Sequence, residues 1–316
     1  MLETIRTMMT GAIDYAGLFP PSQLEMKRAV SDYAKYTRGE HAPFLGRFVC
    51  PAHKLGALSK EGAMVMPGTF ATSGYREHAD DLEPWRVSAV ITGDLPDQLE
   101  TIYEFNERHD REDNGRAMVD AVEMRVRTPA DIDAALGVLP EMIGGAFEVP
   151  QDIVMDGDPR GLIAALAGSG TLAKIRCGGV EEAMIPTSGQ IARFVGACKR
   201  AGVAFKCTAG LHHPVRAEHA LTYEDNAPRG VMHGFVNVFI AAAIADRGQE
   251  PDEALLIRVL DETDPGAFVF GDGSVSWRDH TITEDELGAM RDGLCTSFGS
   301  CSFDEPIDGL KALGLL

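Results

Sequence analysis

Short apolar runs alternate with longer amphipathic stretches along most of the chain. Eight short runs have the composition of buried strands, at residues 11–17, 46–51, 85–93, 117–126, 143–150, 171–177, 203–210 and 267–273. Stretches with the helical spacing of apolar residues lie between them, at residues 23–38, 96–109, 129–139, 159–168, 187–201 and 230–246. Strands that alternate with helices in this way predict a parallel α/β architecture.

Eight strands with intervening helices favour a single (β/α)8 TIM barrel. A doubly wound open sheet is the main rival, but no G-x-G-x-x-G follows any predicted strand. We therefore predict a barrel over residues 1–275. Residues 276–316 hold one predicted helix, near TEDELGAMRDGL, and we expect them to form a C-terminal extension packed on the barrel, with CTSFGSC as a turn. The irregular segment MVMPGTFATSG, in the second crossover, could hold an extra strand.

Composition limits the partners and the cellular compartment that we expect for the barrel. The chain has 316 residues, of which 45% are hydrophobic, enough for one large core. A formal net charge of −19 argues against nucleic acid or an anionic membrane as the main partner. No stretch is long enough to span a bilayer, and the six cysteines form no C-x-x-C. A reducing compartment is the simplest interpretation, so we predict a cytoplasmic protein.

Two lysines stand at equivalent places on neighbouring predicted strands. Lys174 lies in TLAKIRCGG and Lys206 in VAFKCTAGLHH, and each precedes a glycine-containing loop. The stretch between them predicts a crossover helix, so the two strands run parallel and the two ammonium groups become neighbours. Two adjacent cations are unfavourable, and one known use of such a pair is to keep one amine neutral and nucleophilic.

Other polar residues fall where the predicted strands end. In a barrel, side chains at the carboxyl ends of the strands line the active site. Charges buried there are costly unless they are paired, so a dense polar set indicates a purpose. The candidate residues are Asp14, Cys50, Asp120 or Glu123, Glu148, Lys174, Arg176, Lys206, Thr208, His212 and His213.

The order of these motifs resembles the deoxyribose-phosphate aldolases, which are class I (Schiff-base) aldolases with a barrel fold. That family carries its Schiff-base lysine in an IKTSTG pattern on the sixth strand and a second lysine in FKPAGG on the seventh, and AKIRCGG and FKCTAGL stand in those places here. AIDYAGL, FVCPAHKLGALSKEG, MVDAVEM and AFEVP resemble the family's motifs on the first, second, fourth and fifth strands. The resemblance spans residues 11–273 as a succession of motifs, not as continuous identity.

The resemblance implies a reaction and a set of roles. Lys174 would be the nucleophile that forms a carbinolamine and then an imine with a carbonyl substrate. Lys206 would keep that amine partly neutral by like-charge repulsion. Asp120 would move protons through an ordered water as a general acid/base. The imine acts as an electron sink, so a neighbouring carbon–carbon bond can be broken or formed without a cofactor.

Two departures from the family pattern bear on the substrate. Arg176 shares strand parity with Lys174, and a guanidinium there suits a carboxylate or a phosphate. His212 and His213 stand in the loop that helps the family to hold phosphate, which weakens the case for a sugar phosphate. We therefore expect a small, anionic carbonyl compound as the substrate, and a lyase of the aldolase type.

The alternation of side chains along the fourth strand bears on whether Asp120 or Glu123 faces the barrel interior. Residues three apart face opposite sides of a regular strand, so only one of the two carboxylates enters the barrel unless a bulge intervenes. Alternation favours Glu123, because apolar residues share the parity of Asp120 and should face the helices. The resemblance favours Asp120.

A second hypothesis is a metal-dependent lyase or isomerase that stabilises an enolate. Adjacent histidines point in different directions, and the carboxylates match no fixed metal-binding motif. The ligands would come from His212, His213, His233, Glu123 and Glu148.

A third hypothesis is a non-catalytic barrel that binds an anionic metabolite or serves as a scaffold, because fold alone does not establish catalysis. It predicts that Lys174 is salt-bridged to Glu148 or Glu123. Barrels of this type are often dimers, and a homodimer remains open.

Overall fold

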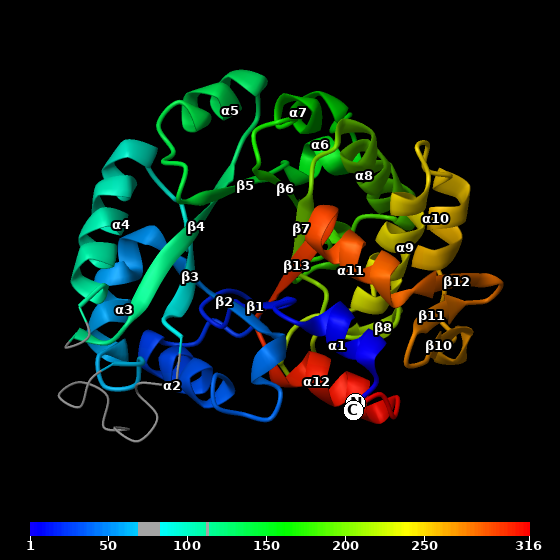
Figure 1. Ribbon diagram of the computed structural model, residues 1–316, viewed down its shortest axis with the longest axis horizontal. Helices are drawn as coiled ribbons and strands as arrows, with labels where there is room; N and C mark the ends of the chain where they lie inside the picture. Colours follow the sequence, from blue (N-terminus) through cyan, green and yellow to red (C-terminus); the bar gives the residue numbers. More distant parts are fainter. Residues whose placement is uncertain (69–82, 112–113) are drawn as a thin grey trace.

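Eight parallel strands close into a barrel in the computed structural model, which describes residues 1–68, 83–111 and 114–316 (Figure 1). The order around the barrel is β1-β13-β7-β6-β5-β4-β3-β2. The predicted (β/α)8 TIM barrel is thereby confirmed. The strands are β1 (Ile13–Tyr15), β2 (Leu45–Pro51), β3 (Trp85–Val90), β4 (Ala117–Arg125), β5 (Gly144–Glu148), β6 (Leu172–Arg176), β7 (Phe205–Thr208) and β13 (Cys295–Ser300).

Helices surround the barrel on its outside (Figure 1). Three of them begin with a capping box, in which a threonine and the residue three positions later satisfy each other's backbone N–H groups; these threonines are Thr128, Thr187 and Thr283. The helices of the described chain are α1 (Glu3–Met9), α2 (Met26–Tyr36), α3 (Leu55–Gly62), α4 (Leu95–His109), α5 (Pro129–Leu136), α6 (Gln151–Met155), α7 (Arg160–Ala165), α8 (Ser188–Ala201), α9 (Phe235–Arg247), α10 (Glu253–Leu260), α11 (Glu284–Gly293) and α12 (Asp304–Ala312).

The eighth barrel strand is not the one predicted from the sequence. The predicted run 267–273 contains β10 (Phe268–Phe270), which pairs in a three-stranded antiparallel sheet with β11 (Ser274–Trp277) and β12 (His280–Thr283). The segment CTSFGSC, predicted to be a turn, instead supplies β13, which lies between β1 and β7. The predicted boundary at residue 275 therefore does not divide a complete barrel from an extension.

The composition of β13 explains why its sequence does not look like a strand. Its inward positions, Ser297 and Gly299, are polar or small because they face charged groups and a cavity. Phe298 faces the helices as an apolar residue would, and its ring stacks on that of Phe235 at a centroid distance of 5.1 Å. A strand with few apolar residues gives a weak periodic signal.

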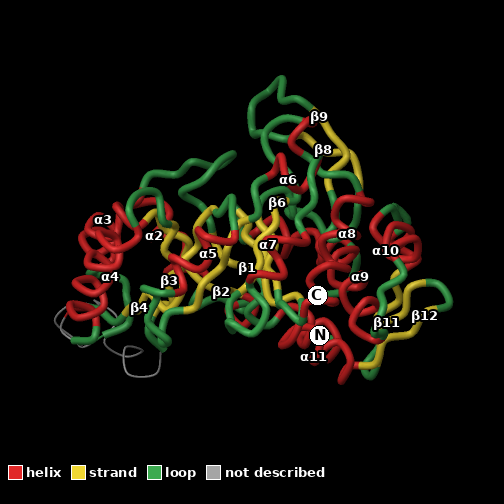
Figure 2. Tube along the Cα trace, turned by 90° about the horizontal axis from the view of Figure 1, so that it is seen from above, coloured by secondary structure: helices red, strands yellow, loops and turns green. Residues whose placement is uncertain are grey.

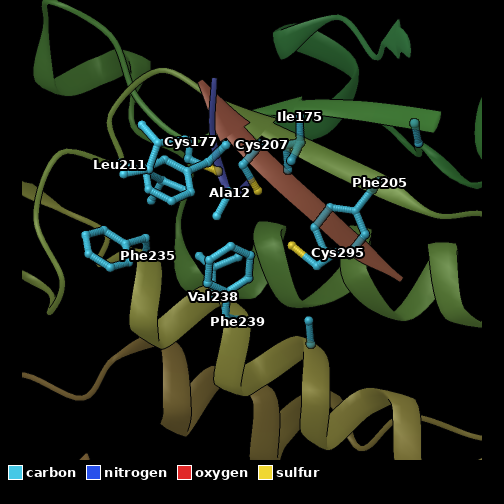
Figure 3. Close-up of a cluster of buried hydrophobic side chains, with 14 of the residues drawn as sticks. Ala12, Ile175, Cys177, Phe205, Cys207, Leu211, Phe235, Val238, Phe239 and Cys295 are labelled. Atoms are coloured by element: carbon cyan, nitrogen blue, oxygen red, sulfur yellow. The ribbon is translucent and has the colours of Figure 1, made fainter. Parts of the chain in front are cut away.

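The longest apolar helix, α9, packs directly against the barrel. Figure 3 shows Phe235, Val238 and Phe239 on α9 facing side chains of the strands, among them Phe205, Cys207 and Cys295. Figure 1 shows α10 on the outer side of α9. The helix is apolar nearly all round because it has protein on both sides.

A hairpin of β8 (Ala217–Ala220) and β9 (Arg229–Met232) projects from one side of the barrel (Figure 2). Residues 64–68 of the segment MVMPGTFATSG contain no strand, and residues 69–74 lie outside the described chain. None of the helices in the described ranges is long and apolar enough to cross a membrane.

Candidate functional site

A cavity of about 670 Å³ opens at the carboxyl ends of the barrel strands. The β8–β9 hairpin contributes to its wall through Leu221 and Met232. A second cavity, of about 320 Å³, lies between α9, β10 and the C-terminus, but only apolar side chains and glycine line it. The residues predicted from the sequence that line the larger cavity are Glu123, Glu148, Lys174, Arg176, Lys206, Thr208 and His212.

The two lysines lie side by side at the floor of this cavity. Lys174 on β6 and Lys206 on β7 are direct partners in the register of the two strands, as predicted. Lys174 Nζ lies 2.7 Å from Glu123 Oε2 and 2.7 Å from Glu148 Oε2. Lys206 Nζ lies 2.7 Å from Glu123 Oε1 and 2.6 Å from Asp14 Oδ2. Glu123 thus bridges the two ammonium groups.

Further donors complete the bonding of the three carboxylates. Ser88 Oγ donates to Glu123 Oε1 at 2.8 Å. Ser297 Oγ donates to Asp14 Oδ2 at 2.8 Å, and the Arg47 amide donates to Asp14 Oδ1 at 2.8 Å. Arg125 Nε donates to Glu148 Oε1 at 3.0 Å. Because every carboxylate oxygen in this cluster accepts a hydrogen bond, the geometry of the five charged groups is fixed.

Electrostatic attraction favours the ionised forms of Glu123, Glu148 and Lys206. Burial alone would raise the pKa of Glu123, but the attraction of Lys174 and Lys206 outweighs burial and holds that pKa well below its usual range. Lys174 lowers the pKa of Glu148 against the same effect of burial. Burial would lower the pKa of Lys206, yet Asp14 and Glu123 raise it. Lys206 is therefore held as an ammonium group beside Lys174.

Asp120 belongs to a different part of the barrel interior. Its carboxylate accepts hydrogen bonds from Arg47 Nε at 2.7 Å and from Arg86 Nε at 2.7 Å, and it does not line the cavity. The register of β3 and β4 shifts between Val87 and Ser88, which leaves Asp120 as an extra, unpaired residue. This bulge breaks the parity relation between Asp120 and Glu123. Glu123, and not Asp120, is therefore the carboxylate of β4 that contacts Lys174.

Cys50 does not line the cavity either. It is fully buried on β2, and its neighbour Val49 is the residue that faces the cavity. Burial raises the pKa of the Cys50 thiol to about 12. The alternation of side chains along β2 therefore turns Cys50 towards the helices.

Arg176 and Thr208 both line the cavity, as predicted. Arg176 forms no ion pair with any residue in the described ranges. Its guanidinium is near enough to Glu148 to help lower the pKa of that carboxyl.

The histidines do not converge on a common point. His212 lines the cavity, and its Nδ1 lies 2.6 Å from Glu305 Oε2. His213 stacks on His219 with ring centroids 3.5 Å apart. His233 Nε2 lies 2.7 Å from the Pro186 carbonyl, away from the carboxylates of the floor. Among the residues that the structure describes, no three ligating side chains form a metal site.

The loops after β6 and β7 touch each other at two glycines. Gly210 has φ +75°, and a Cβ there would lie 2.8 Å from Gly178 Cα. Ala209, just before it, has φ +55°. The close backbone approach holds the two lysine-bearing strands and their loops together at the cavity rim.

Sequence reasoning missed five residues around the cavity: Ser88, Arg125, Ser297, Cys301 and Glu305. Ser88 could have been noticed as the lone hydroxyl inside the apolar run WRVSAV, and Arg125 as a residue with the parity of Glu123. The other three lie on or after β13, which was not predicted as a strand.

Comparison of the chain with protein family models, with curated proteins and with solved structures found no match. The case for a function therefore depends on the geometry of this cavity.

Proposed function

We propose that this protein is a lyase of the class I aldolase type, in which Lys174 forms a Schiff base with a small anionic carbonyl compound. The observation that carries the proposal is the placement of Lys174 at the cavity floor between two carboxylates, beside a second lysine that stays charged. Buried ion pairs are poor stabilisers, so a cluster of five charges beside a cavity favours a catalytic role.

The contacts divide the work between the two lysines. Lys206 is held by Asp14 and Glu123, and its raised pKa keeps it protonated. Lys174 can pass a proton to Glu148, which also lines the cavity, and its freed amine then attacks the substrate carbonyl. The carbinolamine loses water as Glu148 returns the proton to the departing hydroxyl, which leaves an imine on Lys174.

The imine then accepts the electron pair of the carbon–carbon bond that breaks. Glu123 and Glu148 are the groups within reach of Lys174 that can take the proton released from the substrate hydroxyl in that step. Protonation of the resulting enamine and hydrolysis of the imine return the free lysine. In the synthetic direction the same steps run in reverse.

The charge of the cavity supports an anionic substrate. The lysine, arginine and glutamate side chains that line it comprise four cations (Arg125, Lys174, Arg176, Lys206) and two carboxylates (Glu123, Glu148), although the whole chain carries −19. Arg176 is the cation without an ion-pair partner in the described chain, so it is available to bind a carboxylate or phosphate.

Reductive trapping tests the proposal. Protein incubated with aldehydes or 2-keto acids and then with borohydride should gain the mass of one reduced adduct, located on the peptide that contains Lys174. Lys174→Met should abolish the adduct and the activity. Lys199→Met changes a lysine of α8 that pairs with Asp246 outside the cavity, and it should leave both unchanged. An adduct that maps to Lys206, or none with any carbonyl, would overturn the assignment of Lys174.

One observation favours a second candidate, a barrel that binds an anionic metabolite without catalysis. That hypothesis predicts an ion pair between Lys174 and Glu123 or Glu148, and both pairs are present. The two candidates differ in the borohydride experiment, because a lysine that serves only in ion pairs gives no adduct. Binding of an anionic metabolite, measured by calorimetry, without trapping would favour the non-catalytic barrel.

A further inference from the structure

A second reactive group lies in the same cavity, at the end of β13. Cys301 and His212 both line the cavity wall, and Cys301 Sγ lies 3.9 Å from His212 Nε2. The other ring nitrogen, His212 Nδ1, lies 2.6 Å from Glu305 Oε2 on α12. Cysteine, histidine and glutamate are thus arranged as a nucleophile, a base and the group that orients the base.

The contacts around Cys301 distinguish it from the other cysteines. All six cysteines are free and buried, and burial raises the pKa of Cys50 and Cys198. Burial acts in the same direction on Cys301, but hydrogen bonding and charge from His212 outweigh it and lower the pKa of that thiol. Cys301 and Glu305 in turn raise the pKa of His212. The neighbouring His212 therefore stabilises the thiolate form of Cys301.

The side chain of Tyr223 completes the cluster. Its hydroxyl lies 3.6 Å from Cys301 Sγ and 3.2 Å from Glu305 Oε2. The neighbouring wall of the cavity is apolar and comes from the β8–β9 hairpin and the proline pair of the N-terminal loop, through Leu221, Met232 and Pro21. A polarised thiol next to an apolar wall suits a small organic electrophile.

We propose that Cys301 is a second nucleophile of this cavity, oriented by His212 and Glu305, and that it holds an aldehyde as a thiohemiacetal. The sulfur electron pair forms the bond to the aldehyde carbon, the carbonyl oxygen receives the proton of His212 Nε2, and nothing is oxidised or reduced. Loss of the same proton back to His212 releases the aldehyde. The choice of an aldehyde rests on the proposed function, because cleavage of an aldol releases one, whereas the thiolate site itself does not depend on Lys174.

Alkylation of the intact protein measures the reactivity of the thiol. At pH 7, with iodoacetamide and peptide mapping, we expect Cys301 to react about tenfold faster than free cysteine, since His212 stabilises the thiolate form that reacts. His212→Asn should remove that advantage, and Cys198→Ser, at a buried cysteine of α8, should leave it unchanged. A rate for Cys301 no faster than that of free cysteine would overturn the proposal.

Protection by an aldehyde tests the adduct and separates it from imine formation. A short aldehyde such as propanal should slow alkylation of Cys301 both in the wild-type protein and in Lys174→Met, which cannot form an imine. Protection that is absent, or that is lost in Lys174→Met, would overturn the thiohemiacetal. If borohydride trapping fails while protection persists, the Schiff-base function fails and the thiolate site stands.

Discussion

The two ends of the barrel interior share one arrangement of charged side chains, but its surroundings differ between them. Near the amino ends of the strands, Asp120 bridges two arginines, Arg47 and Arg86. Three residues further along β4, Glu123 bridges two lysines, Lys174 and Lys206. Each bridge is one carboxylate between two cations, but only the second lines the cavity.

The difference shows which features distinguish the lysine cluster, for which we propose reactivity, from the arginine cluster. An arginine stays protonated at any physiological pH, whereas a lysine can lose its proton and act as a nucleophile. In the bridge made by Asp120, the side chain of Arg86 is 59% exposed. In the bridge made by Glu123, both lysine side chains are less than a tenth exposed. Burial, lysine chemistry and access to a cavity coincide only at the carboxyl end.

The largest expected effect is a difference in unfolding free energy between variants of the two bridges. Glu123→Gln removes the shared partner of two buried lysines and should cost about 3–5 kcal/mol of unfolding free energy. Asp120→Asn removes the partner of a half-exposed arginine and of Arg47, and should cost about 1 kcal/mol or less. Urea denaturation of both variants measures the difference. Equal losses would show that the two bridges are energetically alike.

Acid should remove the stability that the bridge made by Glu123 contributes. The folded-state pKa values of Glu123 and Glu148 lie below the ordinary value of 4.5, so the stability that these carboxylates contribute is fully present above that pH. It is lost as the pH falls towards the lowered folded-state values. Glu123→Gln should flatten this decline in a series of urea midpoints between neutral and acid pH, and an unchanged slope would contradict the assignment.

Arg176 lines the same cavity as the two lysines, and its substitution should weaken binding of the proposed anionic substrate. A charge-assisted hydrogen bond contributes about 1.5–3 kcal/mol, so Arg176→Gln should raise the KM for an anionic substrate about 10–100-fold with a smaller change in kcat. An uncharged analogue should lose little. As a matched control, Arg193→Gln changes an exposed arginine of α8 outside the cavity and should leave both KM values unchanged. Equal losses for charged and uncharged compounds would exclude Arg176 as the anion-binding group.

The smallest expected effect is the difference in stability loss between substitutions of two glycines that flank β7. Gly210, at the cavity rim, has a left-handed φ and no room for a Cβ against Gly178, so Gly210→Ala should cost about 2–3 kcal/mol. Gly202, at the end of α8, has a left-handed φ of +61° but open space, so Gly202→Ala should cost about 1 kcal/mol. Thermal unfolding measures both, and a larger loss at Gly202 would contradict the close loop contact.

Seven of the eight barrel strands were predictable because their outward residues form apolar runs. The eighth was not, since Ser297 and Gly299 face the interior of β13 and leave Phe298 as its main apolar signal. The same small and polar residues that make β13 part of the site hide it in the sequence. A run of apolar residues at 267–273 took its place in the prediction, although it pairs in a separate sheet.

The site was predictable to a similar degree. The equivalent places of Lys174 and Lys206 on two predicted strands, with a crossover helix between them, predicted that the two lysines are neighbours, and the register confirms it. Alternation chose Glu123, which the structure places between the lysines, whereas the family resemblance chose Asp120. The bulge that gives both carboxylates a place in the interior depends on how β4 pairs with β3, which no local pattern encodes.

The sequence by itself determined the barrel class, the seven strands with apolar faces and the pairing of two lysines, because these follow from side-chain period and the geometry of a parallel crossover. Only the tertiary structure decided which strand closes the barrel, which carboxylate joins the lysines, and that Cys301 meets His212, a residue 89 positions away. Those outcomes depend on contacts between distant segments, where burial and charge act through space and leave no periodic trace along the chain.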